Sequence, residues 1–143
     1  MYKTQAADGA AAALAAVRRH ADSGDWNAAM AACEQAIHDH PLDAATYYTY
    51  ALLSEHIGLA AAAVEALRQA IYLDRGMAMA HYHLGRCLMQ AGESAAAERS
   101  LANALRLIAG RSDNEAVPLG DNLSVGELRR LIEVHRGLLE GRR

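Results

Sequence analysis

The stretch that decides the fold runs from Ala80 to Ala104 and reads AHYHLGRCLMQAGESAAAERSLANA. It divides at Gly92 into two runs that favour helix, because both are rich in alanine, leucine and other helix formers and neither contains proline. A glycine between two helical runs can end the first one in a left-handed conformation at little cost. The stretch therefore predicts a helical hairpin with its turn at Gly92.

The same pattern occurs twice more, each time 34 residues earlier and without a gap. Four columns stay in register: Gly24, Gly58 and Gly92; Ala29, Ala63 and Ala97; Cys33, Leu67 and Leu101; and Ala36, Ala70 and Ala104. The alanine columns lie on faces where paired helices would touch, and a larger side chain there would hold the backbones apart. We expect helices over residues 9–22, 25–39, 43–57, 60–73, 77–91 and 94–109.

A period of 34 residues with one helix–turn–helix in each copy is typical of tetratricopeptide (TPR) repeats. The third copy is the most similar to the motif, because Leu84 and Gly85 match its Leu-Gly pair, although Leu88 replaces the usual tyrosine. The first copy lacks the large motif residues in its first helix. The sequence predicts an all-α fold, an α-solenoid of three tandem TPR hairpins closed by a C-terminal capping helix. The three repeats span about 10–43, 44–77 and 78–109.

The segment after the repeats predicts a loop and one more helix. Residues 110–122 are rich in glycine, serine, aspartate and asparagine and contain Pro118, which favours a loop. Ser124 and Glu127 then have the spacing of a capping box. The terminal repeat of a solenoid exposes an apolar face that needs a cap, so we interpret residues 123–143 as a capping helix and tail. The alternative is a detachable helix that a partner displaces. Residues 1–8 are interpreted as a leader or linker remnant.

Composition excludes several classes of function. The net charge of −3 argues against nucleic-acid binding, which usually needs a basic face. Cys33 and Cys87 are far apart without CxxC spacing, so we expect reduced, buried thiols. The longest apolar run, Ala10 to Val17, is far shorter than the roughly 20 residues of a membrane span, and no signal peptide is present. We therefore predict a cytoplasmic protein without membrane insertion.

No motif predicts catalysis or cofactor binding. The pairs His38 with His40 and His81 with His83 invite a metal-site interpretation, but helical residues two apart point to different sides and zinc needs converging ligands. Neither a Ser-His-Asp arrangement nor a phosphate-binding loop is recognisable. We expect no catalytic residue, no cofactor, no metal and no enzymatic activity of this chain.

The better candidate site is the concave face, which the first helix of each hairpin lines in TPR arrays. The expected partner-binding residues are Arg18, Tyr48, Leu52, His56, Met79, Tyr82, Arg86, Met89 and Gln90. Tyrosine, methionine and arginine are enriched at interfaces, and the mixed apolar surface favours an amphipathic helix or extended peptide as ligand. The alternative, in which Tyr48, Met79 and Tyr82 pack between neighbouring hairpins, stays open. The basic pocket of chaperone-binding TPR domains is not matched.

Residues 63–132 resemble one TPR group in particular. The resemblance is carried by residues 66–74 (ALRQAIYLD), 81–86 (HYHLGR), 104–108 (ALRLI), the loop with Val117 and Pro118, and the helix opener 123–128 (LSVGEL). This half of the chain is similar to the C-terminal TPR region of bacterial CheR-type chemoreceptor methyltransferases, including the WspC-like branch. In that family a methyltransferase domain precedes the repeats and uses S-adenosylmethionine to methylate receptor glutamates.

The resemblance implies a regulatory domain that binds a methyltransferase domain, a chemoreceptor or another signalling partner. The methyltransferase domain itself is absent from this sequence, which has no strand-rich segment with a glycine-rich turn for the cofactor. A stand-alone secretion chaperone of three TPR repeats is the second hypothesis, since copy number and length fit it equally well, although residues 110–132 fit it less well. An enzyme with an unrecognised site is the third, and it predicts turnover by the isolated chain.

Overall fold

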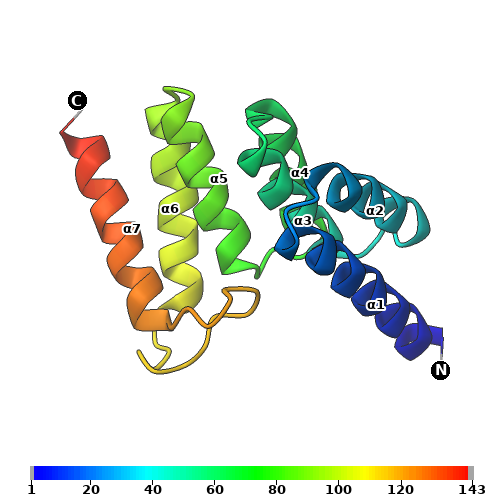
Figure 1. Ribbon diagram of the computed structural model, residues 1–143. Coiled ribbons are helices and arrows are strands. Elements are labelled where there is room, and N and C mark those ends of the chain that lie inside the picture. Colours follow the sequence, from blue (N-terminus) through cyan, green and yellow to red (C-terminus); the bar gives the residue numbers. More distant parts are fainter. Residues whose placement is uncertain (1, 142–143) are drawn as a thin grey trace. The chain divides into compact units, whose positions relative to one another are not determined.

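The computed structural model describes the backbone of residues 2–141 and the side chains of residues 9–141 (Figure 1). The described residues form seven helices and no strand: α1 (Tyr2–Asp22), α2 (Trp26–Asp39), α3 (Ala44–His56), α4 (Ala60–Leu73), α5 (Ala78–Gln90), α6 (Ser94–Ile108) and α7 (Val125–Glu140). The expected solenoid of three helical hairpins with a C-terminal helix is confirmed. The backbone of α1 begins at Tyr2, inside the stretch assigned to a leader. Residues 1 and 142–143, the ends of the expected leader and tail, lie outside the described residues.

The three columnar glycines form the turns of the hairpins. Gly24, Gly58 and Gly92 have φ values of 78°, 86° and 82°, in the left-handed region that favours glycine. In each turn the backbone N–H of the residue after the glycine donates to the carbonyl five residues before it. Glu93 N, for example, donates to Leu88 O at 2.9 Å. This is the hydrogen bond of a Schellman motif, so the glycine both ends one helix and directs the chain into the next.

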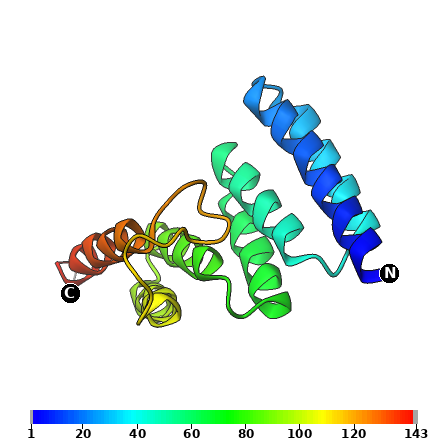
Figure 2. The ribbon, with the colours of Figure 1, turned by 90° about the horizontal axis from the view of Figure 1, so that it is seen from below.

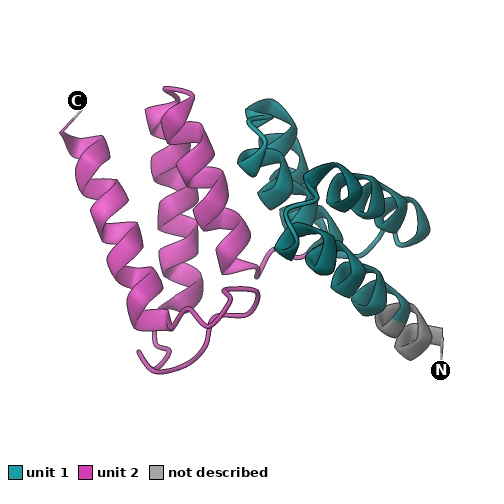
Figure 3. Ribbon diagram, in the orientation of Figure 1, with its two compact units in different colours: residues 1–73 teal, residues 74–143 magenta. Residues whose placement is uncertain are grey.

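The chain divides into two compact units, residues 1–73 and residues 74–143 (Figure 3). The first unit contains the hairpins α1–α2 and α3–α4, and the second contains the hairpin α5–α6 with α7. In both views the two helices of each hairpin lie side by side (Figure 2). No helix among the described residues is long and apolar enough to cross a membrane.

The core of each hairpin is built from the repeat columns. Every alanine, cysteine and leucine of the three apolar columns is at most 2% exposed. In the first unit Val17 of α1 and Cys33 of α2 belong to one core cluster. In the second unit a Cβ added to Gly85 of α5 would lie 2.7 Å from Leu101 Cδ2 of α6. Helices approach this closely only where one partner is small, which explains the small residues of the pattern.

The C-terminal helix α7 packs on α6. Its inward side chains, Leu128, Ile132 and Leu139, are fully buried. The predicted capping box is confirmed, since Ser124 Oγ accepts from Glu127 N and Glu127 Oε1 accepts from Ser124 N, both at 3.1 Å. The cap therefore begins where the sequence predicts it.

The loop before α7 is held by its own backbone hydrogen bonds. Val117 N donates to Leu123 O at 2.9 Å, and Val125 N donates to Glu115 O at 2.8 Å. Val117 is buried, and the ion pair between Asp113 and Arg129 joins the loop to α7. Left-handed backbone at Leu119, Asp121 and Asn122 gives the loop its tight bend. The loop is thus an ordered part of the second unit.

Candidate functional site

The nine residues expected on the concave face divide between the two units. Arg18, Tyr48, Leu52 and His56 belong to the first unit, and Met79, Tyr82, Arg86, Met89 and Gln90 belong to the second. Tyr48, Met79, Tyr82 and Met89 are buried, with exposed fractions of 3–6%. Leu52 and Arg86 are half-buried, whereas Arg18, His56 and Gln90 are exposed. Only these half-buried and exposed residues therefore offer appreciable side-chain surface to a partner.

In the first unit, His56 has a close neighbour of its own. Its ring stacks on the indole of Trp26 with the ring centroids 3.8 Å apart and an angle of 30° between the planes. The stack joins the end of α3 to the start of α2. His56 thus presents the edge of an aromatic pair, a feature that the repeat pattern did not predict.

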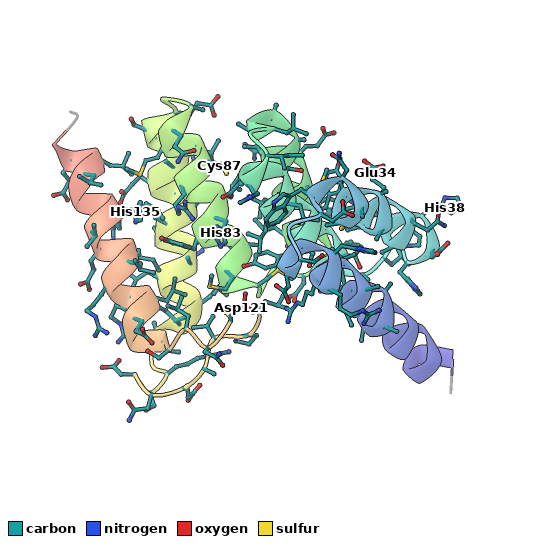
Figure 4. The ribbon with its side chains drawn as sticks, viewed as in Figure 1. Glu34, His38, His83, Cys87, Asp121 and His135 are labelled. Carbon is teal, nitrogen blue, oxygen red and sulfur yellow. The ribbon has the colours of Figure 1, made fainter. Side chains whose placement is uncertain are left out.

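In the second unit, Tyr82 is surrounded by cationic or ionisable side chains. The guanidinium carbon of Arg86 lies 5.9 Å from the centre of the Tyr82 ring. The rings of His83 and His135 meet the same ring edge-on at 5.4 and 5.5 Å. Figure 4 shows His83 on α5 and His135 on α7. The cluster therefore joins the third repeat to the capping helix.

Hydrogen bonds fix the protonation of this cluster. Arg86 Nη1 donates to His83 Nδ1 at 3.3 Å, which requires a neutral His83. Burial, and after it the charge of Arg86, lower the pKa of His83 to about 4. His135 Nδ1 lies 2.8 Å from Leu131 O, and because a carbonyl only accepts, Nδ1 carries the proton. Of Arg86 and His83, only Arg86 is therefore charged near neutral pH.

Arg86 forms no ion pair with any carboxylate among the described residues, since its contacts are His83 and the face of Tyr82. A half-buried guanidinium without an anion keeps its fork of donors available for a carboxylate from outside. The concave-face prediction named Arg86 and Tyr82. It did not include His83, which was considered only as a metal ligand, or His135, which belongs to the helix after the repeats.

The capping helix also carries an exposed apolar stripe. Leu131, Val134 and Leu138 are 37%, 59% and 54% exposed, at helical spacing along one side of α7. Leu131 and Leu138 stand four residues before and three after His135, so the stripe adjoins the cluster around Tyr82.

The first unit contains an open cavity of about 310 Å³. Ile37 of α2, Tyr47 and Tyr50 of α3, and Ala62, Glu65, Ala66 and Gln69 of α4 line it. Tyr47 Oη donates to Pro41 O at 2.9 Å, which orients that ring. Burial, and after it the nearby charge of Glu34, raise the pKa of Tyr50. The cavity was not predicted, since none of its polar residues belongs to a repeat column.

The remaining candidate groups lack the geometry for chemistry. Among the described residues no three His, Cys, Asp or Glu side chains converge on a point that could hold a metal ion. Cys33 and Cys87 are buried and unpaired with each other, as predicted. Burial, and then the charge of Glu34, raise the pKa of Cys33 to about 12, so its thiol stays protonated and unreactive at neutral pH.

No protein-family model matches the sequence. Over 99 residues the chain is 35% identical to the probable biofilm formation methyltransferase WspC of Pseudomonas putida, a match that covers 69% of this chain and 23% of that protein. Over 104 residues it is 33% identical to the TPR and J domain-containing co-chaperone DNJ1 of Cryptococcus neoformans, covering 73% of this chain and 19% of that protein. The chain thus spans less than a quarter of the length of either relative.

Solved structures share the fold over nearly the whole chain. The TPR2B domain of yeast Sti1, solved as a pHsp70 complex, has a TM-score of 0.76 and 21% identity, covering 94% of this chain and 98% of that one. The type III secretion chaperone SycD of Yersinia enterocolitica, solved with a peptide of the translocator YopD, has a TM-score of 0.70 and 19% identity, covering 90% and 95%. The TPR fold expected from the repeat is confirmed.

Proposed function

We propose that this chain is a protein-binding domain, without catalytic activity of its own, that holds an acidic amphipathic segment of a partner on the second unit. The observation that carries the proposal is Arg86, half-buried and without an ion pair to a described carboxylate, beside the exposed apolar stripe of α7. A partner carboxylate would pair with the guanidinium, and apolar partner residues would cover Leu131 and Leu138. Among the expected concave-face residues, Arg86 and Gln90 are the accessible members next to this surface.

The comparisons support this kind of ligand. SycD was solved with a peptide of the translocator YopD, and the TPR2B domain was solved as a complex with pHsp70. A fold shared over 90–94% of the chain is consistent with the same use of its surface, although fold alone does not specify a ligand. The polar and apolar side chains described above therefore carry the choice of an acidic amphipathic segment.

The finer proposal is a regulatory role in chemosensory signalling, in the cytoplasm. It is supported by the 35% identity to WspC and by the segment 63–132, which resembles the TPR region of CheR-type methyltransferases. The partner would then be a methyltransferase domain or a chemoreceptor. The second candidate, a stand-alone secretion chaperone, is favoured by the end-to-end match to SycD, which includes 95% of that chain.

The binding proposal is tested by titrating the chain with an acidic amphipathic peptide and with the same peptide in which every glutamate is replaced by glutamine. Arg86→Gln removes the charge but keeps a side-chain amide, and Arg99→Gln on the exposed face of α6 is the matched control. We expect Arg86→Gln and the glutamine peptide each to weaken binding about tenfold, and Arg99→Gln to leave it unchanged. Equal binding of both peptides by the unchanged chain and by Arg86→Gln would remove Arg86 from the site.

A separate measurement decides between the two finer roles. An antibody raised against this chain would report the mass of the native polypeptide in its source cells. A band several times larger than 15.3 kDa supports the regulatory part of a methyltransferase. A band near that mass makes the stand-alone chaperone the leading function.

A further inference from the structure

A second binding site lies in the first unit, at the cavity between α2, α3 and α4. Its volume of about 310 Å³ is at the lower end of the range of roughly 300–1,000 Å³ that is typical of ligand pockets. Such a space suits one side chain of a partner better than a large cofactor. Tyr47 and Tyr50 are half-buried, so part of each ring remains accessible.

The polar residues of the cavity accept hydrogen bonds or carry negative charge. Glu65 and Gln69 of α4 are exposed at the cavity wall and lie four residues apart on one side of the helix. Glu34 of α2 precedes the lining residue Ile37 by three residues, which places its carboxylate on the same side of that helix. Neither Glu34 nor Glu65 forms an ion pair with any residue that the structure describes. Carboxylates from two walls thus flank two tyrosine rings.

We propose that this cavity binds an arginine side chain of a partner protein. A guanidinium stacks on tyrosine faces and is attracted by their quadrupole. Its planar fork matches the carboxylate of Glu65, and a second edge can donate to Gln69 or Glu34. Lysine has a compact, strongly hydrated ammonium group that does not stack in this way. An anionic residue would face two unpaired carboxylates, and a purely apolar one would leave them without a partner.

The arginine site is independent of the acidic-segment site on the second unit, because no residue is shared. A partner that uses both would carry an arginine and, elsewhere in its sequence, acidic amphipathic residues. A negative result in the Arg86 experiment would therefore not contradict the proposed arginine site. A negative result at the arginine site would likewise not contradict the proposed site at Arg86.

The probe is the capped tripeptide acetyl-Leu-Arg-Leu-amide, and its matched control carries citrulline, which keeps the shape of arginine without the charge. Binding to the full chain is followed by NMR on the ring signals of the tyrosines. We expect the arginine peptide to shift the signals of Tyr47 and Tyr50 and the citrulline peptide to bind about tenfold more weakly. Glu65→Gln should weaken the arginine peptide by a similar factor, whereas Glu133→Gln, an exposed carboxylate of α7, should not.

A second variant distinguishes a loss of binding from a loss of folding. Tyr50→Leu introduces the residue that the third repeat has at the same position, Leu84, and should reduce arginine binding while keeping helicity. Equal affinity for the arginine and citrulline peptides would make this an apolar groove and overturn the proposal. So would the absence of shifts at peptide concentrations up to about 10 mM. Self-association without peptide that Glu65→Gln abolishes would assign the arginine to a second copy of the chain and equally overturn it.

Discussion

Replacing Gly85 by alanine tests how closely α5 and α6 approach. The added methyl carbon would lie 2.7 Å from Leu101 Cδ2 and 2.8 Å from Leu101 Cγ. Favourable carbon contacts are about 3.5–4.0 Å, so Leu101 must retreat by roughly 0.8 Å or more into a core where it is fully buried. Overpacking of this kind costs about 1–3 kcal/mol. The better helix propensity of alanine returns about 1 kcal/mol. We expect a net loss of up to about 2 kcal/mol.

The matched control is the same change at Gly137, in the last turn of α7. A Cβ at that position meets no atom within 4 Å, so only the gain in helix propensity remains. Gly137→Ala should therefore stabilise the chain by about 0.5–1 kcal/mol. The difference between the two variants isolates the steric cost at Gly85, because both glycines are helical and belong to the second unit.

A double-mutant cycle identifies the partner in the clash. Leu101→Ala alone should cost about 2–5 kcal/mol, because it leaves a cavity. In the Gly85→Ala background it should cost less, since the new methyl fills part of that space, with a coupling of about 0.5–3 kcal/mol. Urea denaturation followed by circular dichroism gives these free energies, provided that the m-value stays constant. Equal stabilisation by Gly85→Ala and Gly137→Ala, or the absence of coupling, would refute the close approach.

Two further predictions concern charge and capping. His83 titrates near pH 6.5 when unfolded and at about 4 when folded, so its contribution is fully present above pH 6.5 and is lost as the pH falls toward 4, by at most about 3 kcal/mol. His83→Gln should flatten the decline between those pH values in urea denaturation, and an unchanged slope would exclude His83 as its source. Ser124→Ala removes the cap that accepts from Glu127 N and should lower stability by about 1 kcal/mol, whereas Ser124→Gly should cost only a few tenths, both measured by thermal melting. Equal losses in the two serine variants would contradict the assignment of the cap.

The sequence predicted the helices to within one or two residues, apart from the start of α1 at Tyr2. The helix ends were predictable because left-handed turns require glycine, as at Gly24, Gly58 and Gly92. The helices themselves were predictable because close helix packing requires the buried alanine, cysteine and leucine columns. The beginning of α7 was equally predictable, since Ser124 satisfies a specific backbone donor. Where one residue type satisfies one backbone requirement, a single sequence is sufficient.

Burial at the candidate site was less predictable, because it depends on what the helices pack against. The position of Tyr48 and Tyr82 in the repeat identifies the concave face of a TPR array, but both side chains are buried in this structure. Conversely, the helical spacing of Leu131 and Leu138 is that of a buried face, and yet both are substantially exposed. Periodicity reports the period of an element and not the width of the surface that a neighbour covers.

Two core residues that face each other across a hairpin can keep a similar combined volume when one is larger and the other smaller. Val17 and Cys33 share the core cluster of the first hairpin, and Gly85 and Leu101 meet at the corresponding positions of the third. The larger residue is on the first helix in one hairpin and on the second helix in the other. A column that varies between cysteine and leucine is therefore consistent with one fold, because the facing column varies in the opposite sense.

Positions outside the columns follow a different rule. The position of Glu65 in the second repeat is occupied by Arg99 in the third, and that of Glu34 in the first is occupied by Arg68 in the second. Such reversals of charge cannot be required by a backbone that all three hairpins share. They give each repeat its own surface, so that an arginine cavity forms beside Tyr50 in the first unit. The residues that break the repeat are therefore the ones through which a partner would distinguish one hairpin from the next.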